Sequence, residues 1–212
     1  MAEDVLVIGA GPAGLLAAWT ARQRGERVKV IASGIGTTHI MPGWLQVLDT
    51  DKPIAQAIGQ LAARNPAHPY ALAGADAVQA GITMFRQVIE PAGLHYVGDF
   101  AANYLLPTAL GALQRAAYAP ESFTAGDLRE EGAMLIAGPD GWRDFYPLLC
   151  AENLSQQGVA ARGMTFALPE SETSQFDATP LTMARLFERP EIRERVAYLI
   201  KPRLALTRHF EE

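Results

Sequence analysis

The sequence predicts an α/β protein that begins with a β-strand, a helix and a second, parallel β-strand. A short β-branched run (residues 4–8) leads directly into a glycine-rich loop, an alanine-rich segment (residues 12–24) follows, and a second short apolar run (residues 27–31) comes after it. The chain has 212 residues, of which 49% are hydrophobic and 19% are charged. This length and composition are typical of a soluble protein with a real hydrophobic core.

The glycine loop (residues 9–14) has the pattern G-x-G-x-x-G at the junction of the first strand and the helix. Gly9 permits a tight turn, Gly11 leaves room for a pyrophosphate, and Gly14 lets the helix approach the strand. The helix N-terminus then offers amide N–H groups and a positive dipole end to the phosphates. This context predicts a Rossmann-like dinucleotide site whose cofactor-binding residues include Gly9, Gly11, Pro12, Ala13 and Gly14.

The second strand lacks the acidic residue that usually binds the ribose hydroxyls. It continues into Ala32, Ser33 and Gly34, and a serine hydroxyl cannot replace a carboxylate that accepts two hydrogen bonds. FAD, FMN and a vestigial site therefore remain open at this point. The strand end carries no arginine either, so NADP is not favoured.

The segment after this strand, residues 33–43, is rich in glycine and hydroxyl residues. Ser33, Gly34, Thr37 and Thr38 are candidate ligands for phosphate or ribityl oxygens, although an ordinary hydroxyl-rich turn has the same composition. His39 is a candidate for contact with a flavin ring, and the alternative is a loop histidine without a cofactor role.

The remaining chain predicts a mixture of helices and strands. Helices are expected over residues 52–64, 74–90, 142–157, 182–188 and 191–200, and strands over residues 94–97, 134–137 and 159–168, with an extended segment over 103–111. We expect residues 1–48 to form the start of a flavin domain and residues 49–212 to form a cap or substrate-like α/β region.

Several classes of function are disfavoured by composition. The net charge is −5 and no basic cluster is present, which argues against nucleic-acid binding. The single cysteine, Cys150, is expected to be a buried apolar residue in a reducing compartment. No metal-ligand spacing and no catalytic residue can be assigned, and Arg86, Arg115 and Arg143 are equal candidates for binding a phosphate. The N-terminus does not have the pattern of a signal peptide, and no stretch is long enough to span a bilayer, so a cytoplasmic location is expected.

Residues 7–18 resemble the FAD loop of flavoproteins with two dinucleotide-binding domains. Further motifs follow in order: residues 32–34, 38–39, 42–45, 68–70 and 103–111, then the segments beginning at Trp142 and Thr179. Their succession resembles the B subunit of anaerobic glycerol-3-phosphate dehydrogenase over nearly the whole chain.

The resemblance implies an oxidoreductase that uses FAD or FMN and belongs to a complex of several subunits. Such complexes oxidise glycerol 3-phosphate to dihydroxyacetone phosphate and pass the electrons to quinone. The B subunit is linked with electron transfer and with peripheral attachment at the inner face of the cell membrane through its partners.

The sequence departs from this family at its C-terminus. Family members continue into a glycine-rich segment that returns to the flavin domain, and this segment is not found before Glu212. A truncated or split member is therefore expected. Two alternatives are a non-catalytic module that binds a partner and a different FAD-dependent oxidoreductase.

Overall fold

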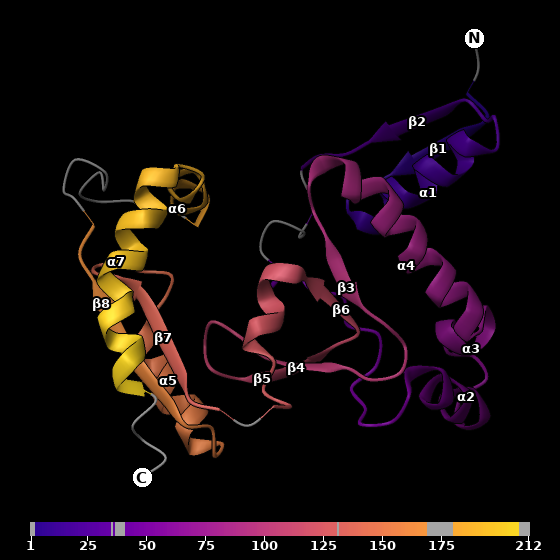
Figure 1. Cartoon of the computed structure of the whole chain (residues 1–212). Coiled ribbons are helices and arrows are strands. Elements are labelled where there is room, and N and C mark those ends of the chain that lie inside the picture. Colours follow the sequence, from indigo (N-terminus) through magenta and orange to yellow (C-terminus); the bar gives the residue numbers. More distant parts are fainter. Residues whose placement is uncertain (1–2, 35, 37–40, 131, 169–179, 208–212) are drawn as a thin grey trace. The chain divides into compact units, whose positions relative to one another are not determined.

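The computed structural model describes residues 3–34, 36, 41–130, 132–168 and 180–207, and Figure 1 shows its elements along the chain. The chain divides into two compact units. The first comprises Met1–Asn103 and Ala116–Ser122, and the second comprises Tyr104–Arg115 and Phe123–Glu212. Each unit has its own hydrophobic core.

The first unit begins with the predicted βαβ arrangement. It consists of β1 (Val5–Ile8), α1 (Pro12–Gln23) and β2 (Val28–Ile31). The two strands are parallel and pair residue by residue, from Val5 with Val28 to Ile8 with Ile31. Helix α1 contacts both strands. The α/β class and the βαβ start are thus confirmed.

Four helices and a second strand pair follow in the described part of the first unit. They are α2 (Ile54–Arg64), α3 (Pro69–Ala73), α4 (Ala75–Ile89), the short 3-10 helix η2 (Glu90–Ala92), and the antiparallel strands β3 (Tyr96–Gly98) and β6 (Tyr118–Pro120). The buried core residues are Ile54, Ile58, Phe100, Ala117 and Tyr118. Because Ile54 and Ile58 are four residues apart, they lie on one face of α2 and pack into this core together.

The second unit contains another parallel βαβ arrangement. Strands β4 (Tyr104–Pro107) and β5 (Leu113–Ala116) pair with each other; β7 (Met134–Pro139), α5 (Pro147–Gln156) and β8 (Ala161–Phe166) follow, and then α6 (Pro180–Phe187) and α7 (Pro190–Thr207). The short 3-10 helix η3 (Glu121–Gly126) precedes β7. The core of this unit consists of Phe166, Met183, Leu186, Ile192 and Val196. Since Ile192 and Val196 are four residues apart, α7 turns one apolar face to this core.

The helix predicted over residues 142–157 begins later than expected. Gly141 adopts a left-handed backbone with a φ of +73°, and α5 starts only at Pro147. The ring of Pro147 disfavours the helical region for the preceding residue, and Tyr146 accordingly has φ −118° and ψ 88°. The prediction of a helix start at Trp142 is therefore wrong.

Other boundaries also differ from the sequence prediction. The strand expected over 94–97 lies at Tyr96–Gly98, and α7 continues to Thr207 instead of ending at residue 200. Helix α3 and strands β5 and β6 had no sequence prediction, because each is a short element of three to five residues without a clear apolar period.

Candidate functional site

The glycine loop forms a tight turn between β1 and α1. Gly9 has a φ of +106°, which disfavours residues with a side chain, and its amide N–H donates a 2.8 Å hydrogen bond to the carbonyl oxygen of Ile31 in β2. The turn is therefore fixed to the end of the neighbouring strand. Gly9 thus has the backbone conformation that the sequence motif predicts.

Gly14 brings α1 close to the turn. A Cβ atom built at this position would overlap the backbone oxygen of Gly9 and would lie 3.4 Å from Cγ1 of Val7. Only a glycine fits without moving the helix away from the strand. The close packing of helix on strand that the third glycine predicts is therefore present.

Gly11 faces open space at the N-terminus of α1. It is the N-cap residue, in an extended conformation with φ −78° and ψ 173°, and no side chain caps the helix. A Cβ atom built at Gly11 would meet nothing within 4 Å. Within the described residues this position is therefore open, and the amide groups of Ala13 and Gly14 belong to the first helical turn, where N–H groups have no intrahelical partner.

The segment after β2 returns to the glycine loop. Ser33 and Gly34 are exposed, and a Cβ atom built at Gly36 would lie 3.1 Å from the Cα atom of Gly11. Gly36 has a φ of +73°, and the sequence did not predict that it lies against Gly11. The only sequence signal for it was the glycine content of residues 33–43. Thr37, Thr38 and His39 lie outside the described residues.

The start of the βαβ unit is held by an ion pair. Arg27 donates from Nη2 to Asp4 Oδ1 at 2.8 Å and from Nε to Asp4 Oδ2 at 3.0 Å, so both carboxylate oxygens are bound. The side-chain hydrogen bond from Arg27 lowers the pKa of Asp4. This pair joins the two strands at the end opposite the glycine loop.

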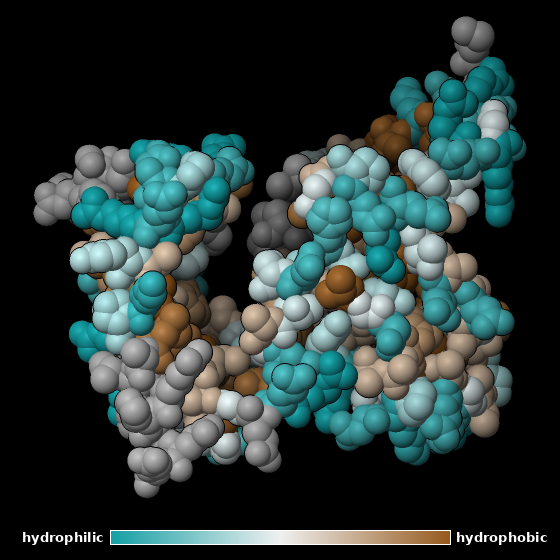
Figure 2. Space-filling view, viewed as in Figure 1, coloured by the Kyte–Doolittle hydropathy of each residue, from teal (hydrophilic) through white to brown (hydrophobic). Residues whose placement is uncertain are grey.

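One face of the β1–β2 sheet is exposed and carries Lys29 among apolar side chains. Leu6, Ile8 and Ile31 alternate with the residues that face α1, and Ile8 is 79% exposed. Figure 2 shows hydrophobic residues at this end of the unit among hydrophilic ones. Within the described residues, nothing covers this face.

The other residues weighed from sequence have structural contacts. His68 caps α3, since its Nδ1 accepts a 3.1 Å hydrogen bond from the amide of Tyr70. Thr108 closes the turn after β4, where its Oγ1 accepts from the amide of Ala112 at 3.0 Å. Arg86 pairs with Glu90 at 3.2 Å and lies over the ring of Tyr118. These contacts account for His68 and Thr108 without a ligand, whereas Nε of Arg86 is buried and has no hydrogen-bond partner among the described residues.

Metal sites and membrane-spanning helices are two further features that bear on function. In the described part of the chain, no three histidine, cysteine, aspartate or glutamate side chains gather in a way that would hold a metal ion. Every described helix is too short or too polar to cross a lipid bilayer.

Comparison with known proteins decides the family. The sequence profile described as "FAD binding domain" matches residues 4–195, which include the glycine loop and most of both units. The chain belongs to the FAD-binding-domain family. This assignment agrees with the turn at Gly9, the close approach at Gly14 and the open space at Gly11.

Within this FAD-binding-domain family, the chain is homologous to the B subunit of anaerobic glycerol-3-phosphate dehydrogenase. It is 32% identical to that protein from Pectobacterium carotovorum subsp. carotovorum (strain PC1), over 91% of this chain and 49% of the relative. Identity to the protein from Mannheimia succiniciproducens is 32%, over 72% of this chain and 38% of the relative. The protein from Glaesserella parasuis is 33% identical, with the same two coverages. No solved structure matches.

The chain spans about half the length of the curated relatives that it matches. The family profile covers residues 4–195, which include the N-terminal βαβ unit. An activity of the full-length relatives can therefore only be proposed for this chain.

Proposed function

We propose that this chain is the flavin-binding part of an oxidoreductase similar to the B subunit of anaerobic glycerol-3-phosphate dehydrogenase. The single observation that supports it most is the open space at Gly11, beside an uncapped helix N-terminus, in a chain that matches the FAD-binding-domain family. FAD is the first candidate cofactor and FMN is the second.

The residues of the loop fit a dinucleotide in three ways. Gly11 would admit the pyrophosphate, the first turn of α1 would donate amide hydrogen bonds, and Gly9 would hold the turn that aims those amides. Ser33 and Gly34 lie exposed where the ribose would pass. Thr37, Thr38 and His39 stay predicted contacts. When bound, the flavin would supply the redox chemistry.

The proposed substrate is glycerol 3-phosphate, which the name of the relatives contains. It would be oxidised to dihydroxyacetone phosphate, and the electrons would pass to quinone through other subunits of a cytoplasmic complex attached peripherally to the membrane. We propose residues 1–48 as the start of the flavin domain and residues 49–212 as its cap or substrate-like region. The exposed face of Leu6, Ile8 and Ile31 would then be covered by further strands or helices of a complete flavin domain.

A second candidate function is a non-catalytic module that binds a partner. The observation that favours it is the serine at position 33, where a carboxylate would normally hold the ribose. A third is an FAD-dependent oxidoreductase with another substrate. These candidates differ in whether flavin binds and in whether glycerol 3-phosphate reduces it.

The test is a titration of the purified chain with FAD, FMN and NAD, followed by absorbance and fluorescence quenching. We expect flavin to bind, and we expect Gly11→Ala to lower the affinity for flavin by about tenfold, or roughly 1.4 kcal/mol of binding free energy. The control is Gly59→Ala, because a Cβ atom at Gly59 also meets nothing within 4 Å but lies in α2.

The outcomes separate the candidates. Loss of the visible flavin band on addition of glycerol 3-phosphate supports the dehydrogenase. Flavin that binds but stays oxidised indicates another substrate. A folded chain that binds no flavin, or equal affinity in the Gly11→Ala variant, would contradict the proposed cofactor site.

A further inference from the structure

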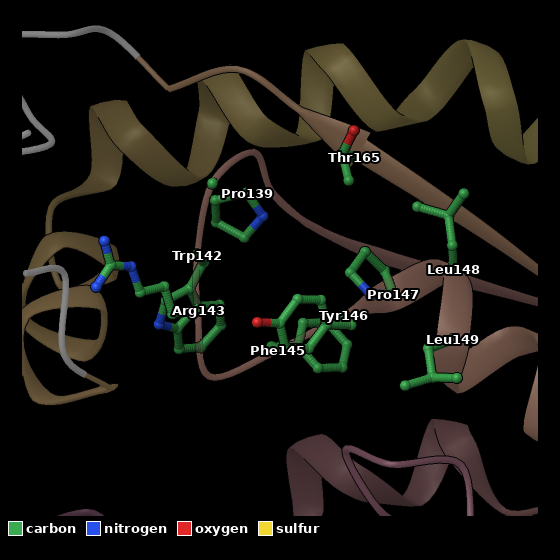
Figure 3. A pocket seen from close by; sticks show the side chains of 10 residues that line it. Pro139, Trp142, Arg143, Phe145, Tyr146, Pro147, Leu148, Leu149 and Thr165 are labelled. Carbon is green, nitrogen blue, oxygen red and sulfur yellow. The ribbon is translucent and has the colours of Figure 1, made fainter. Parts of the chain in front are cut away.

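A cavity of about 370 Å³ lies in the second unit, where β7 turns into α5 (Figure 3). Cavities of this size hold small molecules in many proteins. Its walls come from the turn after β7, the first turn of α5 and strand β8. The lining residues are Pro139, Gly141, Trp142, Arg143, Phe145, Tyr146, Pro147, Leu148, Leu149 and Thr165.

The cavity occupies a position where α/β proteins bind ligands. β7 and β8 are parallel, and Pro139 and Thr165 lie at or next to their carboxyl ends. Ligands of open α/β sheets bind beyond the carboxyl ends of parallel strands, because the turns into the helices leave a crevice there. This location is independent of the glycine loop in the first unit.

Two glycines hold the walls of the cavity close together. A Cβ atom built at Gly138 would lie 2.8 Å from the ring of Phe145, and one built at Gly163 would lie 2.5 Å from the Cα atom of Leu148. The turn and the start of α5 therefore pack directly on the strands. This packing fixes the backbone of the turn and of the first turn of α5 against the strands.

The walls are mainly aromatic and apolar. The rings of Trp142 and Phe145 contact each other edge to face, with centroids 5.9 Å apart. Tyr146 and Leu148 are 56% and 61% exposed, so large apolar side chains stand in solvent at the mouth. Such a lining favours a flat apolar ligand over a sugar phosphate, which needs many polar partners.

Two polar groups of the lining have no partner among the described residues. The indole Nε1 of Trp142 is buried and has no hydrogen-bond partner among the described residues, although buried indole N–H groups usually have one. Arg143 is exposed and likewise makes no ion pair with the part of the chain that the structure describes. In Figure 3 both groups lie on one side of the view, and Leu148 and Leu149 lie on the other. The lining therefore has a polar end and an apolar end.

We propose that this cavity binds a flat aromatic molecule of about two fused rings that carries one anionic group. The rings would pack against Trp142, Tyr146 and Pro147, and the apolar edge would point toward Leu148. The anionic group would pair with the exposed guanidinium of Arg143. The proposal does not depend on flavin binding at the glycine loop.

The test uses naphthalene-2-sulfonate as the probe and the three tryptophans as reporters. The whole chain, labelled with ¹⁵N at its tryptophans, gives three indole signals, from Trp19, Trp44 and Trp142. We expect the probe to shift the Trp142 signal and to leave the other two unchanged, because they lie in the first unit. Naphthalene-2-methanol, which has the same rings without the charge, should bind about threefold more weakly.

Variants of exposed residues test the two ends of the cavity. Arg143→Gln should weaken probe binding by about threefold, and Tyr146→Ala by about tenfold. Arg195→Gln removes an exposed arginine from α7 in the same unit and should have no effect. The proposal is overturned if the Trp142 signal does not move, if all three indole signals move alike, or if Arg143→Gln binds as tightly as Arg195→Gln.

Discussion

At the scale of single residues, the glycines of the loop have different sensitivities to substitution. Gly11 faces open space, whereas Gly14 lies against the backbone of Gly9. A methyl group at Gly11 is therefore expected to affect the proposed binding beside the loop, and a methyl group at Gly14 is expected to affect the fold itself. The motif assigns the two positions different roles, and their surroundings in the structure differ accordingly.

We predict that Gly14→Ala destabilises the chain by about 1–3 kcal/mol, because α1 must move away from β1 to admit the Cβ atom. The measurement is urea unfolding followed by circular dichroism. Gly59→Ala is the control and should raise stability by about 0.5–1 kcal/mol, because Gly59 is an exposed helical residue with space around it. Equal stability of Gly14→Ala and the unmodified chain would contradict the described contact.

The contacts of Asp127 allow a second prediction, which concerns the dependence of stability on pH. Its Oδ1 accepts a 3.0 Å hydrogen bond from the amide of Leu105, and its Oδ2 accepts one of 2.7 Å from Nε of Arg129. Burial acts to raise the pKa of Asp127, but the hydrogen bonds from Arg129 and from the two backbone amides outweigh it, so the pKa is lowered. The carboxylate is therefore favoured more in the folded chain than in the unfolded chain.

We expect Asp127→Asn to cost about 1–2 kcal/mol at neutral pH. Since the folded pKa lies below the unfolded value of about 3.9, the contribution of Asp127 is present above this pH and disappears as the pH falls through the lowered folded pKa. Unfolding free energies of both proteins between neutral and acidic pH provide the check. A difference that stays constant down to the lowest pH would exclude this linkage.

At the scale of elements, side chains of α5 hold the turn between β4 and β5. Asn153 donates from Nδ2 to the carbonyl oxygen of Leu110, and Gln157, next to the helix end, donates from Nε2 to that of Gly111, each at 2.7 Å. A Cβ atom at Gly111 would overlap the carbonyl oxygen of Cys150. The turn thus packs tightly on the helix.

Asn153→Ala should lower the free energy of opening this turn by about 0.5–1.5 kcal/mol, because the carbonyl oxygen of Leu110 loses its donor. Faster hydrogen exchange at the amides of Gly111 and Ala112 would report the change. Gln156→Ala is the matched control, since Gln156 is exposed on the same helix and should leave both exchange rates unchanged. If both variants exchange at the same rate, the contact does not hold the turn.

The sequence predicted long elements better than short ones. The β1–α1–β2 unit was predictable because a strand, a glycine motif and a helix occur in succession, and each supports the others. Strands β5 and β6 were not, because residues 113–120 carry no alternating pattern and are ordered by partners distant in sequence. In the candidate site, the conformations at Gly9 and Gly14 were predictable, and the contact of Gly36 with Gly11 depended on a turn without a specific motif.

At the scale of the whole molecule, the chain has two separate cores. Ile54 is fully buried in the core of the first unit, and Leu186 is buried in that of the second. The cores share no residue. A substitution in one core is therefore expected to destabilise mainly the unit that contains it.

Ile54→Ala and Leu186→Ala should each cost about 2–5 kcal/mol through the cavity that they leave. Hydrogen exchange measured by mass spectrometry should locate the loss: Ile54→Ala should raise exchange in α2 and α4, and Leu186→Ala should raise it in α6 and α7. Ile8→Thr, on the exposed sheet face, should cost less than about 0.5 kcal/mol. Exchange that rises throughout the chain in either core variant would show that the two units unfold together.

The position of Cys150 has a practical consequence for experiments. The thiol is 2% exposed, its Sγ lies 3.6 Å from the carbonyl oxygen of Thr108, and burial raises its pKa. A protonated, covered thiol reacts slowly with maleimides. A cysteine placed at exposed Ala13, within the glycine loop, would thus be labelled selectively without removal of the native one. A fluorescent dye attached there would turn the arrival of a cofactor into a direct optical signal.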